Sequence, residues 1–202
     1  MSDTLKYIIL AIAGYLIGSF SFGMTTSQVT HGPDLRKVGS GNTGASNALR
    51  AMDTKRGLIV FLGDFAKGAL ACGLGWWLTG SVYGAMLAGL CAVIGHNWPV
   101  YYGFHGGKGV STSTAVGLCC FPIPALIGYA AAILAIWATR FISLGSMIFV
   151  VLFALFTTIL AAHGDWLIIA WAWVLALMCV WRHRSNIKRL LRGEERKIGE
   201  KL

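Results

Sequence analysis

The sequence predicts an all-α integral membrane protein with seven transmembrane helices, with the N-terminus outside the cytoplasm and the C-terminus within it. Of its 202 residues, 56% are hydrophobic and 12% are charged, and this is about half the charge of an average soluble domain. Several windows of about 20 residues are nearly free of charge, which is the length that crosses a bilayer core. Lysine and arginine gather in alternate connections between these windows. We therefore expect one transmembrane domain over residues 1–202 and not a soluble globular fold.

The apolar windows follow one another along the whole chain. Pro122 and Pro124 interrupt the stretch 111–139, which fits either two short helices that meet near the prolines or one long kinked helix. With two helices in that stretch, the predicted spans are 5–26, 57–79, 82–98, 111–126, 127–139, 144–162 and 165–181.

The distribution of basic residues favours two helices in that stretch, and so seven spans in all. With seven spans, fifteen lysines and arginines lie on one side, only Lys6 lies on the other, and Lys67 lies within a span. A single span over 111–139 would move Arg140 and the tail to the opposite side. Cytoplasmic connections are the ones rich in these residues. The same rule explains the net charge of +9, so no nucleic-acid partner is expected. The fifteen are Arg36, Lys37, Arg50, Lys55, Arg56, Lys108, Arg140, Arg182, Arg184, Lys188, Arg189, Arg192, Arg196, Lys197 and Lys201.

The polar segments also gather on the cytoplasmic side, near 36–56, 96–112, 140–146 and 182–195. Polar chemistry on one membrane face is typical of an enzyme that receives its substrates from that side. A transporter places polar groups along a path through the midplane, and no internal repeat is evident. A small transporter of a phosphorylated solute remains the alternative. A third possibility is a non-catalytic subunit that binds anionic lipid.

The segment VGSGNTGASNALR, residues 38–50, has the composition of a loop that holds an oxyanion. Its glycines permit positive φ and successive backbone N–H groups that point at an anion, while Ser40 and Asn42 add side-chain donors. A helix that begins near Ala45 would add positive potential, and Arg50 could bind a phosphate through two hydrogen bonds. The structural alternative is a flexible turn between two helices.

A second glycine-rich segment, Gly106-Gly107-Lys108-Gly109, leads into an apolar helix through a run of hydroxyl side chains. Its composition suits phosphate, but Tyr102 and Gly109 exclude the spacing of the nucleotide-binding P-loop. The alternative is an ordinary interfacial loop. Just before it, His96 could bind phosphate or act as a base, or it could bind a backbone carbonyl at a helix end.

Two further segments are ambiguous on their residues alone. Arg140 with Ser143 and Ser146 fits a positive-inside arginine followed by a serine helix cap. The segment WRHRSNIKRLLRGEE fits a basic tail on anionic lipid, although His183 and Asn186 are less well explained by that.

The remaining polar and sulfur-containing residues point mainly to structural roles. Asp64 and Lys67, three residues apart in the second span, are expected to neutralise each other on one helix face.

The five cysteines form no CxxC pair and are expected to be buried as small hydrophobes. No HxxxxD, GxSxG or HExxH motif is present. A protein poor in bases and rich in anion donors would position charged substrates and stabilise developing negative charge.

Three segments in this order, GSGNTGASN with Arg50, GHNWPVYYGFHGGKGVSTS and HRSNIKRLLRGEE, resemble the three cytoplasmic motifs of the bacterial acyl-phosphate:glycerol-3-phosphate acyltransferase family. GDFAKGAL and RFISLGS are similar to further segments of that family. The resemblance covers about residues 5–195. It implies a seven-helix enzyme of the bacterial inner membrane, with its active site facing the cytoplasm.

The resemblance implies transfer of an acyl group from acyl phosphate to the 1-hydroxyl of sn-glycerol 3-phosphate, giving 1-acylglycerol 3-phosphate (lysophosphatidic acid) and phosphate. It implies no metal or cofactor and no direct use of acyl-CoA or acyl carrier protein. A substrate phosphate would take the proton of the attacking hydroxyl. Partners would be these substrates and membrane lipids. A monomer is consistent with the sequence, which gives neither the oligomeric state nor the preferred acyl chain length.

The resemblance also implies roles for individual residues. Ser40 and Asn42 would line the active site, Arg50 would hold the phosphate of glycerol 3-phosphate, and Lys108 would bridge the substrate phosphates. Ser143, preferred over Ser146, would contact glycerol 3-phosphate together with His183 and Asn186. The residues expected to support these contacts are Arg140, His96 and the backbone donors of Gly106, Gly107 and Gly109.

Overall fold

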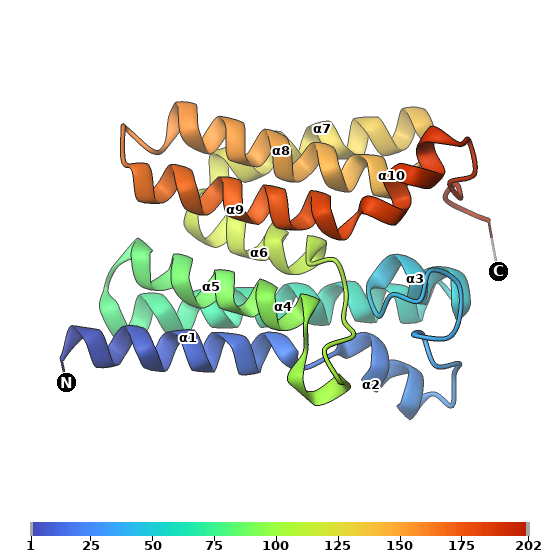
Figure 1. Cartoon of the computed structure of the whole chain (residues 1–202), viewed down its shortest axis with the longest axis horizontal. Coiled ribbons are helices and arrows are strands. Elements are labelled where there is room, and N and C mark those ends of the chain that lie inside the picture. The colour runs from blue at the N-terminus through green and yellow to red at the C-terminus, as the bar shows by residue number, and fades with distance from the viewer. Residues whose placement is uncertain (1, 201–202) are drawn as a thin grey trace. The chain divides into compact units, whose positions relative to one another are not determined.

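The computed structural model describes residues 2–200, so Lys201 of the basic tail lies outside the described residues. Within this range the regular structure is helical, with no strand. The chain forms two compact units, the described residues up to Cys120 and Phe121–Glu200 (Figure 1).

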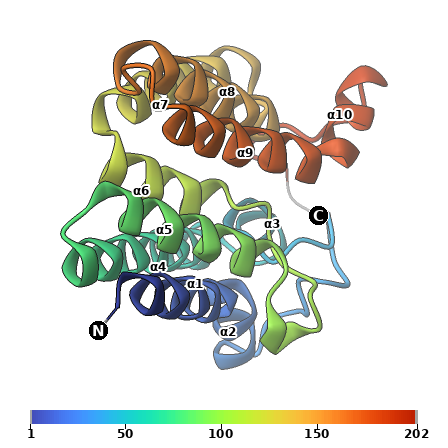
Figure 2. The ribbon, with the colours of Figure 1, turned by 60° about the vertical axis from the view of Figure 1, so that its left-hand side comes forward.

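In the first unit, α1 packs closely on α5. A Cβ atom at Gly14 or Gly18 of α1 would overlap the α5 backbone at Ala88 or Ala92. Small residues at such a contact let two helix backbones approach, which is how membrane helices gain packing energy without water. Figure 2 shows α1, α4 and α5 lying side by side in this unit. The unit consists of α1 (Asp3–Ser19), α2 (Phe22–Val29), α3 (Ala45–Ala51), α4 (Thr54–Thr79), α5 (Val82–Asn97), the 3-10 turn η1 (Val100–Tyr102) and α6 (Val110–Cys120).

In the second unit, α8 packs on both α7 and α9. Its core is aromatic: the Phe153 ring lies 6.1 Å from that of Phe149 and 6.0 Å from that of Trp171. Such ring pairs add to the stabilisation from buried area. The unit consists of α7 (Pro122–Thr139), α8 (Ile142–Leu160), α9 (Trp166–Arg182) and α10 (Arg184–Leu191).

The predicted helices are present, and one predicted boundary is wrong. The span 5–26 lies within one apolar segment, Asp3–Val29, but that segment has an unpredicted break at Phe20 and Ser21, where the Ser21 side chain accepts a hydrogen bond from the Met24 N–H at the start of α2. The stretch 111–139 does form two helices, but they part at Phe121 and not after residue 126. Pro122 opens α7 because the first helical position needs no N–H donor.

The helices have the length and apolar surface of an integral membrane protein. Four segments are long and apolar enough to cross a bilayer, namely Asp3–Val29, Thr54–Thr79, Pro122–Thr139 and Ile142–Leu160. A fifth is added if α9 and α10, bent by 57°, count as one span. Trp77 and Trp137 are 80% and 82% exposed, as lipid-facing aromatics are. Seven spans and the orientation of the termini stay predictions.

The cysteines follow the expectation only in part. Cys72, Cys120 and Cys179 are buried, and Cys91 is half-buried. The expectation was wrong for Cys119, which is exposed on α6. An apolar face of a membrane protein can carry a small hydrophobe on its outer surface as readily as in its core.

Candidate active site

The loop 38–50 is organised around the buried amide of Asn47. Its Nδ2 donates to the carbonyls of Leu35, Val38 and Asn42 at 2.9–3.1 Å, and its Oδ1 accepts from the Ser40 N–H at 3.0 Å. One side chain therefore satisfies four backbone groups in and beside the loop. Sequence reasoning missed this role, because the sequence does not distinguish a buried asparagine from the exposed polar residues around it.

The predicted ligand groups of this loop surround that core. Ser40 is exposed between Gly39 and Gly41, which both adopt positive φ as expected. The Oδ1 of Asn42 accepts from the Gly44 N–H at 2.9 Å and so forms a turn just before α3.

The helix that follows the loop begins at Ala45, as predicted, and carries a predicted phosphate ligand at its far end. Arg50 lies half-buried in the last turn of α3. A cation in that position interacts favourably with the C-terminal end of the helix. Arg50 therefore lies at the other end of α3, along the chain, from Ser40 and Asn42, which precede that helix.

The second glycine loop lies directly on the C-terminal end of α5. The Gly107 N–H was expected to bind a ligand. It donates instead to the His96 carbonyl at 3.0 Å, so the expectation for this donor was wrong. A Cβ at Gly106 would overlap the same carbonyl, and a Cβ at Gly107 would overlap the His96 ring. Gly109 has φ of 78° and is the residue before α6. Lys108 is half-buried between these buried glycines.

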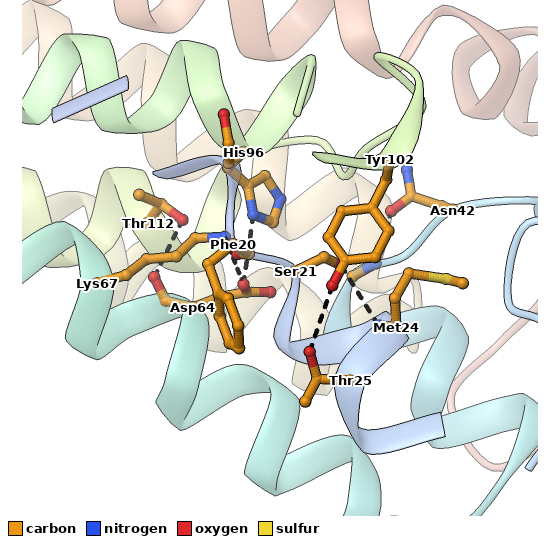
Figure 3. A network of polar contacts seen from close by, with 12 residues as sticks. Phe20, Ser21, Met24, Thr25, Asn42, Asp64, Lys67, His96, Tyr102 and Thr112 are labelled. Atoms are coloured by element: carbon orange, nitrogen blue, oxygen red, sulfur yellow. Dashed lines mark hydrogen bonds and ion pairs between the residues drawn. The ribbon is translucent and has the colours of Figure 1, made fainter. Parts of the chain in front are cut away.

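Tyr102 of η1, in the segment that leads to the second glycine loop, packs beside the first loop. Tyr102 packs on the apolar cluster beneath loop 38–50, which contains Met24, Leu35, Ala48 and Val60. Its hydroxyl lies 3.4 Å from the Thr25 hydroxyl of α2 (Figure 3). The first unit thus gathers the predicted residues of the first two motifs.

His96 faces the interior of the first unit. Its Nδ1 lies 3.4 Å from the Oδ1 of Asp64, which forms a 2.8 Å ion pair with Lys67 (Figure 3). The expected neutralisation of Asp64 by Lys67 is confirmed. Sequence reasoning did not connect that pair to His96, because His96 lies on the next helix, α5, 29 residues after Lys67.

In the second unit, Ser143 and Asn186 meet on the carboxylate of Glu195. Ser143 Oγ and Asn186 Nδ2 each donate to its Oε1 at 2.7 Å, and Arg189 Nε donates to Oε2 at 2.7 Å. Burial raises the pKa of Glu195, but these hydrogen bonds outweigh it and hold the pKa below its ordinary value. This carboxylate was missed by sequence reasoning, where it was only the end of a basic segment.

The same contacts correct the expectation of a serine cap in RFISLGS. Phe141 is the N-cap of α8 and no side chain caps that helix end. Ser143 reaches Glu195, whereas Ser146 Oγ donates to the Ile142 carbonyl of its own helix at 2.8 Å. Ser143 is therefore the hydroxyl that lies among the other predicted residues of this unit.

His183 stands at the junction of α9 and α10 and is buried. Its Nδ1 lies 2.9 Å from the Cys179 carbonyl. A carbonyl only accepts, so Nδ1 carries a proton, and in the neutral ring Nε2 is the acceptor.

Arg140 ends α7 with φ of 64° and is exposed. Its Nη2 donates to the Ile198 carbonyl, and its own carbonyl accepts from the Ile198 N–H, both at 2.8 Å. Arg140 thus ties the tail that carries Glu195 to the start of α8. Within residues 2–200, no group of three or more histidine, cysteine, aspartate or glutamate side chains is placed to hold a metal ion.

The sequence is closely similar to known acyltransferases over nearly its whole length. The profile of the family described as Glycerol-3-phosphate acyltransferase matches residues 8–193. A glycerol-3-phosphate acyltransferase of Halalkalibacterium halodurans is 42% identical over 197 residues, covering 96% of each chain. One of Anaeromyxobacter sp. is 41% identical over 203 residues, covering 98% of this chain and 99% of the other.

The fold matches solved structures of the same kind. The glycerol 3-phosphate form of PlsY (YgiH), an integral membrane glycerol 3-phosphate acyltransferase, aligns with a TM-score of 0.88 and 36% identity over 96% of each chain. The lysophosphatidic acid form of PlsY aligns with a TM-score of 0.85 and 35% identity, over 96% of this chain and 95% of the other. The resemblance found in the three motifs is confirmed. The chain belongs to the integral membrane glycerol-3-phosphate acyltransferase family.

Proposed function

We propose that this chain transfers an acyl group from acyl phosphate to the 1-hydroxyl of glycerol 3-phosphate. The observation that carries the proposal is the pair of glycine loops in the first unit, each with one half-buried cation, Arg50 or Lys108. Two phosphate-bearing substrates require two such cations, and backbone donors alone do not neutralise them. The glycerol 3-phosphate and lysophosphatidic acid forms of the solved relatives agree with this substrate and product.

Each predicted residue has a role that its contacts can perform. Arg50 holds the phosphate of glycerol 3-phosphate, Lys108 bridges the substrate phosphates, and Ser40 and Asn42 orient them as donors. Gly106 and Gly109 shape the phosphate loop and supply its backbone donors, while Gly107 holds it on α5. In the second unit, Ser143, His183 and Asn186 contact the glycerol moiety, and Arg140 supports them by fixing the tail.

The reaction needs little covalent chemistry from the protein. The 1-hydroxyl oxygen attacks the acyl carbon, and the bond between that carbon and the phosphate oxygen breaks. Phosphate departs as a good leaving group, because the donor is a mixed anhydride, and a phosphate oxygen takes the hydroxyl proton. Lys108 stabilises the negative charge that develops on the departing phosphate. The Nε2 of His183 accepts a hydrogen bond from the glycerol moiety and so orients it.

The proposal includes a topology. Seven spans in the bacterial inner membrane, with the N-terminus outside and the C-terminus inside, place both glycine loops and the segments 140–146 and 182–195 in the cytoplasm. Support comes from the basic residues, which under this arrangement lie almost entirely on the cytoplasmic side. Soluble glycerol 3-phosphate and a lipid-tailed acyl phosphate can then meet at one membrane surface.

The experiment compares donors with purified protein in detergent. Palmitoyl phosphate with glycerol 3-phosphate is expected to give phosphate and lysophosphatidate, and palmitoyl-CoA is expected to give neither. Turnover with palmitoyl-CoA alone would contradict the donor assignment. A folded protein inactive with every donor, which moves glycerol 3-phosphate into proteoliposomes, would favour the transporter instead.

A further inference from the structure

The middle of α4 buries a charged pair that the proposed reaction does not use. Asp64 and Lys67 are 1% and 4% exposed, and their ion pair spans 2.8 Å. Removing two charges from water costs about as much as their attraction returns, so a buried pair is a poor source of stability compared with apolar residues. Folding energy alone therefore does not explain the pair, and each partner makes further contacts.

Asp64 leads to the second glycine loop. Its Oδ1 lies 3.4 Å from the Nδ1 of His96, and the opposite edge of that ring fills the space where Gly107 would carry a Cβ. The Asp64 carbonyl also accepts from the Thr112 hydroxyl at 3.0 Å, in the first turn of α6. Contacts from Asp64 thus reach both ends of the loop that contains Lys108.

Lys67 leads to the first glycine loop. Its Nζ donates to the Phe20 carbonyl at 2.7 Å, at the break between α1 and α2 (Figure 3). The carbonyls at a helix end lack helical partners, so a lysine there fixes the break. On α2, Gly23 lies so close to the Thr43 carbonyl that a Cβ would overlap it. The position of α2 therefore sets the position of the loop that contains Ser40 and Asn42.

We propose that Asp64 and Lys67 are positioning residues that set both glycine loops, 106–109 through His96 and 38–50 through Phe20 and α2. The inference rests on the phosphate role proposed for these loops. A single ion pair ties the two loops to one helix, so a shift of either charge displaces both phosphate positions. Misplacement of a reacting group by about 1 Å is enough to slow an enzyme strongly.

The test separates positioning from simple charge neutralisation. Asp64→Asn and Lys67→Met each leave one buried charge without its partner, so both single variants are expected to unfold at lower temperature. The double variant D64N/K67M removes both charges and is expected to unfold within a few degrees of the wild type. Its kcat/KM for glycerol 3-phosphate is nonetheless expected to stay at least tenfold low, mainly through KM. Recovery of both stability and activity in the double variant would overturn the proposal.

The chain offers a matched control. Asp3 and Lys6 on α1 form an ion pair of the same residue types and the same spacing, at 3.0 Å, but Asp3 is exposed and Lys6 is only half-buried. The variant D3N/K6M is expected to leave stability, KM and kcat unchanged. A loss in this control equal to that in D64N/K67M would also overturn the proposal, because it would show a general effect of charge removal.

A further readout does not depend on the double variant being active. Hydrogen exchange of the amides in 38–50 and 106–109 is expected to rise in D64N and K67M, more than in the rest of the first unit. Unchanged exchange in both loops contradicts the positioning role even if the protein proves to use another acyl donor. If the proposed reaction is wrong, the wild type shows no turnover with palmitoyl phosphate, and the exchange measurement still decides.

Asp64 and His96 should also act in series. His96→Gln removes the ring that fills the space against Gly107, and adding Asp64→Asn is then expected to change KM less than twofold further. Independent, multiplicative effects of the two substitutions on KM would contradict the relay through His96.

Discussion

The Glu195 carboxylate accepts hydrogen bonds from both Ser143 Oγ and Asn186 Nδ2 at 2.7 Å, with Oε1 as the shared acceptor. The three residues come from the start of α8, from α10 and from the tail after it. Glu195 is 7% exposed, so this is a buried polar junction and not a surface ion pair. It holds two side chains proposed to touch glycerol 3-phosphate, and it makes their orientation depend on the tail.

Substituting Glu195 separates its buried bonds from its charge. Glu195→Ala leaves the Ser143 and Asn186 donors without their acceptor, which should lower the free energy of unfolding by roughly 2–4 kcal/mol. Glu195→Gln keeps an oxygen for both donors and loses only the pair with the partly exposed Arg189, so about 1 kcal/mol is expected. Thermal unfolding in detergent measures both. Equal losses in the two variants would contradict the assignment of the buried bonds.

The lowered pKa of Glu195 makes stability depend on pH. A carboxyl with a lower pKa in the folded state stabilises the protein fully above its unfolded pKa, near the ordinary value of 4.5. That contribution is lost as the pH falls from there through the folded pKa. The midpoint of thermal unfolding should therefore drop below about pH 4.5, and drop less in Glu195→Gln. Identical acid profiles of wild type and variant would refute the linkage.

Ser143 and Ser146 form a matched pair on α8. Ser143→Ala should lower kcat/KM for glycerol 3-phosphate at least tenfold. The Ser143 hydroxyl shares the Glu195 acceptor with Asn186, which is also proposed to contact this substrate. The kcat/KM of Ser146→Ala should stay within twofold of the wild type, since the Ser146 hydroxyl donates to the Ile142 carbonyl of its own helix. Steady-state kinetics at varied glycerol 3-phosphate decide between them. A larger effect of Ser146→Ala would reverse the choice of serine.

Asn47 is expected to be essential for the first loop even though it lies beneath its surface. Asn47→Ala removes the donor to the carbonyls of Leu35 and Asn42 and the acceptor of the Ser40 N–H, while the Val38 carbonyl keeps its bond from the Gly41 N–H. This should cost roughly 2–3 kcal/mol of stability and most of the activity. Asn47→Asp should be at least as damaging, because a carboxylate cannot donate to the carbonyls of Leu35, Val38 and Asn42. An active, stable Asn47→Asp enzyme would show that these hydrogen bonds do not organise the loop.

The two cations of the glycine loops should matter for chemistry and little for folding. Lys108→Ala and Arg50→Ala are each expected to lower kcat/KM by about 100-fold or more, with the unfolding temperature nearly unchanged. Arg50→Lys should recover only a fraction, because an ammonium cannot form two parallel bonds to a phosphate. Activity retained in both alanine variants would show that these cations do not bind the substrates.

Local patterns in the sequence predicted the features that depend on neighbouring residues. Apolar windows predicted the long helices, the end of the glycine-rich run predicted a helix that begins near Ala45, and the spacing of Asp64 and Lys67 predicted their ion pair. These depend on helix periodicity and capping, which act over a few residues.

The features that sequence reasoning missed depend on distant contacts. Glu195 meets Ser143 across 52 residues, and no spacing rule links a tail carboxylate to a serine on another helix. The break at Phe20 lies in an apolar run without proline, where Lys67, 47 residues away, binds the freed carbonyl. Asn47 pairs with backbone groups whose positions are known only once the loop is folded.

Acyl transfer to the hydroxyl predicts where each oxygen atom of the substrates ends up, which isotope labelling measures. An acyl phosphate can react at its acyl carbon or at its phosphorus. With glycerol 3-phosphate labelled with ¹⁸O at the 1-hydroxyl, purified protein and palmitoyl phosphate should give lysophosphatidate that retains the label in its ester and phosphate that carries none. Unlabelled palmitate released together with a doubly phosphorylated glycerol would show attack at phosphorus and contradict acyl transfer.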